Sequence, residues 1–121
     1  MQATLTGADL SALLEPLPSS IETLTRRLVA MIAAHPGLSG RVMRGWRSIN
    51  FHHGKGGLVC AVFPYDDRVA LYFQNGRMLD DTEQMLAGNG KTARYLSLLP
   101  RAEIPIDAIG VLIAEAIALM H

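Results

Sequence analysis

The sequence predicts an α+β fold: an antiparallel sheet of about four strands with N-terminal helices and a C-terminal helix packed on it. Apolar residues recur at helical spacing near both ends of the chain and alternate with polar residues through its middle, where glycine and proline turns separate the alternating runs. The 121 residues are 50% hydrophobic and contain no repeat or linker-like segment. We therefore expect one domain with one core over residues 1–121.

Two helices are expected before residue 38. Thr6 and Asp9 have capping-box spacing, and the short helix that they begin ends at the prolines of residues 16–18. Ser19 and Glu22 repeat the capping pattern. The second helix then carries apolar residues at helical spacing until the His-Pro-Gly stop at residues 35–37.

From residue 48 onward, apolar and polar residues alternate with a period of two, as in a β-strand. Residues 48–52 alternate, a glycine-rich turn follows at residues 53–57, and residues 58–63 form a β-rich run that Pro64 bounds, which predicts a hairpin. After a turn at residues 65–68, a third strand is expected over residues 69–74, ending at Asn75-Gly76.

The last third of the chain is expected to hold a short helix, a strand and a long helix. Asp81 and Gln84 predict a helix over residues 82–87, which Gly88 ends in a left-handed conformation. Residues 92–99 predict the fourth strand. Pro105 suits the first turn of the C-terminal helix, whose apolar residues cover more than one face.

The charge balance and the cysteine content indicate which classes of partner and which cellular compartment to expect. Eleven basic residues balance eleven acidic ones without a run of like charges, which argues against nucleic acid and against a membrane surface. The single cysteine cannot form an internal disulfide, and the N-terminal residues lack the pattern of a secretory signal. We therefore expect a cytoplasmic protein.

The segment "GNGKT" at residues 88–92 contains the end of a nucleotide-binding loop. A phosphate loop needs a glycine where Met85 stands, and it leads from a strand into a helix. Here the expected order is the reverse. We interpret the segment as a helix stop followed by a turn.

Several short motifs together resemble a known family. They are Trp46, "YFQNG" at residues 72–76, "LDD" at 79–81, "LAGNGK" at 86–91, "RY" at 94–95 and "IAEA" at 113–116. In order and spacing, this chain is similar to the YdhG-like family of domains of unknown function over residues 10–118. The resemblance implies a small α+β domain with helices on an antiparallel sheet. Some members of the family are described as frataxin-like iron chaperones, which makes metal handling one alternative function. An enzyme of unassigned class is the other alternative.

A polar and aromatic sheet face is the main candidate site. Strand alternation directs Ile49, Phe51 and Leu71 to one side and leaves the other side to a set that alternates with them. That set comprises Asn50, His52, Tyr72 and Gln74, and Tyr95 can join it from the last strand. Aromatic rings supply contact area while amide, imidazole and hydroxyl groups orient a partner. The competing interpretation is an ordinary solvated or dimer-covered face.

Trp46 lies between two arginines and gives a second candidate. Cation–π stacking or capture of an anion there is one interpretation, with Lys91 and Arg94 as further donors. The other interpretation, which we favour, is a tryptophan that plugs the edge of the core while its arginines face water.

Catalytic and metal-binding patterns are weak. Cys60 could be a nucleophile if His52 lay across the hairpin, but a lone cysteine in an apolar strand is usually a core residue. His52 and His53 suggest a metal pair, but neighbours on a strand point to opposite faces. Asp80, Asp81 and Glu83 could coordinate a divalent cation through oxygen, but we favour capping of the following helix as the explanation of an Asp there. We therefore assign no catalytic residue, metal or cofactor, and favour a non-catalytic domain that binds a small ligand or a protein, including a second copy of itself.

Overall fold

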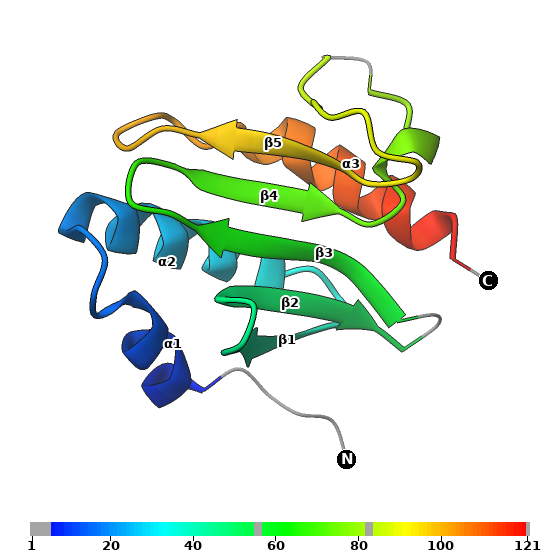
Figure 1. Cartoon of the computed structure of the whole chain (residues 1–121). Coiled ribbons are helices and arrows are strands. Elements are labelled where there is room, and N and C mark those ends of the chain that lie inside the picture. The colour runs from blue at the N-terminus through cyan, green and yellow to red at the C-terminus, as the bar shows by residue number, and fades with distance from the viewer. Residues whose placement is uncertain (1–5, 55–56, 82–83, 121) are drawn as a thin grey trace.

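A computed structural model describes residues 6–54, 57–81 and 84–120. The described residues form three α-helices, five strands and one short 3-10 helix, in a single α+β arrangement (Figure 1). In chain order they are α1 (Gly7–Leu14), α2 (Ser19–Ala33), β1 (Leu38–Met43), β2 (Ser48–His53), β3 (Gly57–Pro64), β4 (Val69–Phe73), η1 (Gly76–Met78), β5 (Arg94–Leu98) and α3 (Ile106–Ala118).

The strands form one antiparallel sheet in the order β1-β2-β3-β4-β5, so each strand pairs with the next one along the chain. The predicted fold class is confirmed, with one strand more than expected. β1 escaped the sequence analysis because Gly40 interrupts its apolar pattern. Phe51 of β2 lies opposite Gly40, and a Cβ on Gly40 would be 2.8 Å from Cε1 of that ring. The phenyl ring thus occupies the space that a side chain in β1 would fill.

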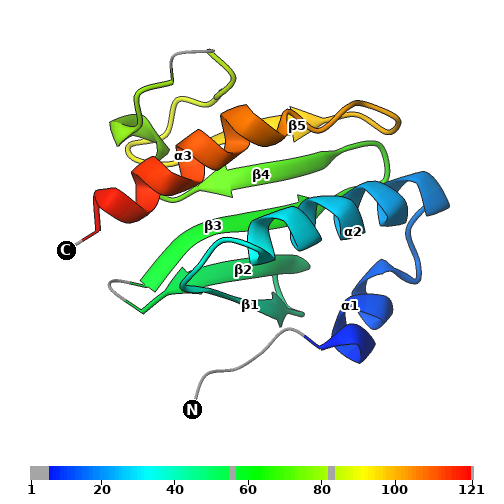
Figure 2. The same cartoon turned by 180° about the vertical axis from the view of Figure 1, so that it is seen from behind.

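Helices α2 and α3 lie over one face of the sheet, as Figure 2 shows from that side. The core fills the space between the layers. Its central row runs across four strands in the pairing Ile49, Val62, Leu71 and Leu96, and each of these side chains is buried. In the described part of the chain, the opposite face carries no helix (Figure 1). We call it the open face.

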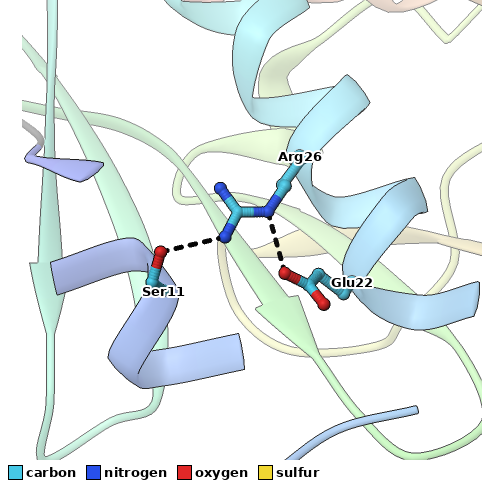
Figure 3. A network of polar contacts seen from close by, with 3 residues as sticks. All are labelled: Ser11, Glu22 and Arg26. Atoms are coloured by element: carbon cyan, nitrogen blue, oxygen red, sulfur yellow. Dashed lines mark hydrogen bonds and ion pairs between the residues drawn. The ribbon is translucent and has the colours of Figure 1, made fainter. Parts of the chain in front are cut away.

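Helix α1 begins where the sequence predicts and is tied to α2. The Thr6 hydroxyl accepts a hydrogen bond from the backbone N–H of Asp9 at 3.1 Å, which caps the helix. Arg26 of α2 joins the two helices, since its guanidinium donates to Glu22 at 3.0 Å and to the Ser11 hydroxyl at 3.1 Å (Figure 3).

The predicted cap of α2 is wrong. Pro18 is the N-cap and makes no side-chain hydrogen bond, while its carbonyl accepts from the backbone N–H groups of Ile21 and Glu22. The helix therefore relies on its buried stripe, which includes Leu24, Leu28 and Ile32.

The predicted helix over residues 82–87 is also wrong as far as the structure describes it. Residues 82 and 83 lie outside the described residues, and residues 84–87 are not helical. The Asp81 carboxylate accepts from the backbone N–H groups of Met85 and Leu86, both at 2.8 Å, and Ala87 pairs with Tyr95 instead. Local side-chain bonds of this kind compete with a helix. Gly88 does adopt the expected positive φ, at 116°.

The C-terminal helix follows Pro105 as predicted, although that residue is the N-cap and α3 starts at Ile106. Ile109, Leu112 and Ile113 are its buried residues. Within the described ranges, none of the helices is long and apolar enough to span a membrane.

Candidate binding face

The strand register builds the open face in rows. Asn50, Ala61, Tyr72 and Tyr95 lie side by side across β2 to β5, because each pair is directly opposed in the antiparallel ladder. Three of the predicted site residues thus share one row. The register also places Phe63 opposite Ala70 and Ala70 opposite Ser97, in the next row of the same face.

Three aromatic rings form a continuous cluster on this face. The rings of Tyr72 and Tyr95 are stacked, with centroids 5.7 Å apart and an angle of 15° between their planes. Phe63 meets Tyr72 edge to face at 5.8 Å. We call these three residues the aromatic ridge. Ala61 and Ala70, both buried, occupy the neighbouring positions of β3 and β4.

Asn50 lies on the open face but does not present its amide to solvent. Asn50 is 5% exposed, and its Oδ1 accepts a hydrogen bond of 2.7 Å from the Ser48 hydroxyl, which is fully buried. This bond satisfies a hydroxyl that would otherwise be buried without a partner. The Asn50 amide oxygen thus has a structural partner, and the role of Asn50 in orienting a ligand stays a prediction.

The remaining predicted members lie at the margin. His52 is half-buried and opposes Ser39 and Leu58, beyond a bulge that separates it from the regular part of β2. Gln74 is exposed but follows the end of β4, in a turn. The ridge itself, rather than these polar groups, is the distinctive feature of the face.

Arg41 adds a positive charge to the outer strand. It opposes Asn50 from β1, is exposed, and its guanidinium donates to the Met43 sulfur at 3.3 Å. Among the described strand residues on the open face there is no carboxylate. The sequence analysis missed both Arg41 and Phe63, because β1 was not recognised and the bulged residue Val59 disturbs the alternation of β3.

Trp46, Lys91 and Arg94 do not form one site. Trp46 lies in the β1–β2 turn, whereas Lys91 lies in the β4–β5 connection at the opposite end of the sheet. Arg94 opposes Phe73 on the helix-covered side, and its Nη1 donates to the carbonyls of Gly90 at 2.8 Å and Ala93 at 2.7 Å. The predicted grouping is wrong because it ignored which end of the sheet each turn occupies.

Trp46 does not plug the core, which corrects the interpretation that we favoured. Its side chain is 64% exposed. The ring lines a cavity at the end of the sheet, which is described below.

Cys60 is a core residue. It opposes Phe51 and Phe73 on the helix-covered face, whereas His52 opposes Leu58 on the other face. Burial raises the pKa of the Cys60 thiol from 9.0 to about 12. Without a nearby imidazole, nothing in the register favours the thiolate that a nucleophile needs.

No group of three His, Cys, Asp or Glu side chains is arranged to hold a metal ion within residues 6–54, 57–81 and 84–120. Both carboxylate oxygens of Asp81 accept from backbone N–H groups. Glu83 lies outside the described residues.

The segment around Lys91 leads into β5, with no helix between the two. It therefore has neither the flanks nor the helix N-terminus of a phosphate loop.

No family model, curated protein or solved structure matches this chain. The resemblance to the YdhG-like family stays a prediction.

Proposed function

We propose that this chain is a non-catalytic protein-binding domain that docks through its open face, and that its partner is a second copy of the chain. The aromatic ridge carries the proposal. Antiparallel sheets with one covered face usually turn polar residues to the other, solvated side. Here Phe63, Tyr72 and Tyr95 gather on that side, and Tyr72 is 39% exposed.

The composition of the face resembles that of protein interfaces. Aromatic residues, methionine and arginine are enriched in interface cores, and other charged residues are depleted there. Met43 and Arg41 lie in β1, and β2 separates them from the ridge. The two tyrosine hydroxyls give the apolar rings a polar end, which suits a surface that is wet in the free protein and buried in the complex.

Shape and charge favour a second copy as the partner. Two sheets pack face to face about 10 Å apart when the side chains of their inner faces interdigitate. In the proposed dimer, a two-fold axis parallel to the strands, between β3 and β4, would set Tyr72 of one copy above Ala61 of the other and Phe63 above Ala70. The formal net charge of zero removes long-range repulsion between copies. Arg41, in the outer strand, stays far from its symmetry mate.

A small molecule fits this face less well. Small ligands bind in concave sites that bury most of their surface. Two cavities in the described chain lie elsewhere, one against α1 at the end of the sheet and one beside α3. Only Phe63 of the ridge reaches either cavity.

Sedimentation velocity over a range of concentrations tests the proposal. The parent chain is expected to sediment as a dimer that dissociates on dilution, and Tyr72→Glu is expected to be monomeric because docking would bury an unpaired carboxylate. Val111→Glu is the matched control, since it places the same charge on α3 at a side chain that is 64% exposed. That variant should remain dimeric.

Two results overturn the proposal. One is a parent chain that stays monomeric at the highest concentration. The other is a dimer that Val111→Glu disrupts and Tyr72→Glu does not, which would assign the interface to the outer side of α3.

A further inference from the structure

A cavity of about 560 Å³ lies at the end of the sheet, where Phe63 of the aromatic ridge lines it and Tyr72 and Tyr95 do not. Three segments enclose it: α1 with the prolines that follow, the β1–β2 turn and the β3–β4 turn. Leu13, Leu17, Val42 and Pro64 supply apolar lining. Its volume is within the range of roughly 300–1,000 Å³ that is typical of small-molecule sites. We call it the Trp46 pocket.

Two aromatic rings that line the pocket are exposed to solvent. Trp46 is 64% exposed and Tyr65 is 41% exposed, and both line the cavity. Large exposed rings beside an apolar hollow indicate a binding site, because a flat apolar ligand removes their surface from water together with its own. Arg68 stacks over the Tyr65 ring at 4.4 Å from its centroid, which fixes one wall.

One guanidinium at the pocket has no partner among the residues that the structure describes. Arg44 pairs with Asp9 at 3.4 Å, across an exposed contact. The Arg47 side chain has no hydrogen bond or ion pair within the described residues, although it lines the same cavity. A free guanidinium presents a planar fork that matches a carboxylate.

The backbone of Arg47 adds a second observation. Its φ is 55°, in the left-handed region that favours glycine. An arginine is therefore present at a position where the turn geometry would prefer another residue. Non-glycine residues in this conformation concentrate at functional sites.

We propose that the Trp46 pocket binds a small aromatic carboxylate. The ring of the ligand lies against Trp46 and Tyr65, and its carboxylate accepts from the Arg47 guanidinium. Asp66 also lines the pocket and has no ion pair in the described chain. Its charge disfavours a phosphate dianion more than a singly charged carboxylate, so the pocket selects the latter.

Proton–nitrogen correlation NMR tests the proposal directly, because Trp46 is the sole tryptophan of the chain and gives one indole N–H signal. The probes are 2-naphthoate and its neutral counterpart 2-naphthamide. Titration with 2-naphthoate is expected to shift the indole signal in a saturable manner. The amide should bind about tenfold more weakly, because it cannot form the charge-assisted hydrogen bonds.

Two variants separate the contributions. Arg47→Gly keeps the turn, since glycine tolerates this φ, and is expected to abolish the preference for 2-naphthoate over the amide. Asp66→Asn is expected to strengthen binding of 2-naphthoate severalfold and leave binding of the amide unchanged. Lys91→Ala, at the other end of the sheet, is the control and should bind both probes as the parent does.

The proposal is overturned if the indole signal does not respond up to the solubility limit of the probe. Equal affinity for the two probes, or an unchanged preference in Arg47→Gly, would also overturn it. These outcomes are independent of the open face. Tyr72→Glu should bind 2-naphthoate as the parent does, and Arg47→Gly should have the sedimentation behaviour of the parent.

Discussion

The two faces of the sheet are built from the same strands and yet differ in burial. Leu71 and Tyr72 are neighbours in β4, but Leu71 is fully buried beneath the helices and Tyr72 is 39% exposed on the open face. The helix-covered face is a packed core, where volume and burial determine stability. The open face has the aromatic content of a core without a layer over it, and this difference is the basis of the proposed docking surface.

The largest expected effect is on the free energy of unfolding, which a substitution on the helix-covered face should lower more than one on the open face. Leu71→Ala should lower the free energy of unfolding by about 2–5 kcal/mol, because it removes buried methyl groups and leaves a cavity. Denaturant unfolding at a concentration that keeps the chain monomeric measures it. Tyr72→Ala is the control and should cost about 1 kcal/mol, the contribution of its ring pairs. Equal losses would contradict the contrast between the faces.

Cys60 gives the helix-covered face a pH dependence. Its pKa is about 12 in the folded chain against 9.0 for an ordinary thiol, so both states are protonated below pH 9.0. Above that pH the unfolded chain loses the proton first. The free energy of unfolding should then fall by up to about 1.4 kcal/mol per pH unit, until the pH approaches about 12.

Denaturant unfolding of the parent and of Cys60→Ala at a series of pH values above 9.0 tests this linkage. Other groups titrate equally in both proteins, so the difference between the two slopes isolates the thiol. Parallel pH profiles would mean that the thiol is not buried as described.

A substitution at Gly76 tests how tightly this residue packs against Arg94, the first residue of β5. A Cβ on Gly76 would lie 2.5 Å from the Cβ of Arg94 and 2.8 Å from its backbone nitrogen. Gly76→Ala should therefore destabilise the fold by about 1–3 kcal/mol, because backbone must move. A Cβ on Gly7 would meet no described atom within 4 Å beyond its chain neighbours and its own helix backbone, so Gly7→Ala should be neutral or stabilising by up to about 1 kcal/mol. Thermal unfolding compares the two, and similar shifts would contradict the contact.

The smallest expected change in stability concerns a buried hydroxyl group of α2. The Thr25 hydroxyl of α2 is buried and has no hydrogen-bond partner among the described residues. Thr25→Val keeps the shape of the side chain and removes an unsatisfied group, so it should stabilise the fold by about 1 kcal/mol. A lower midpoint in denaturant unfolding would show that the hydroxyl has a partner in solution.

The sequence predicted the parts of the fold that local patterns determine. The alternation around Leu71 and Tyr72 is confirmed, and so is the Thr6 cap. Local patterns fail where distant residues decide the outcome. The strand around Gly40 is completed by Phe51, and Asp81 binds two backbone N–H groups that a helix would have used otherwise.

The candidate site shows the same division. Alternation alone brings Tyr72 and Tyr95 to one face, because neighbouring strands keep the same period. The position of Trp46 relative to Lys91 depends on which end of the sheet each connection occupies, which requires the full strand order. Phe63 and Arg41 belong to the face through register, and a bulge and an unrecognised strand concealed that register from the sequence.

The most direct measurement is an isotope-filtered NMR experiment on an equimolar mixture of labelled and unlabelled chain. We expect intermolecular contacts from the rings of Tyr72 and Tyr95 to the methyl groups of Ala61 and Ala70. Intermolecular contacts confined to α3, or none at concentrations well above those of the sedimentation experiment, would contradict docking through the open face.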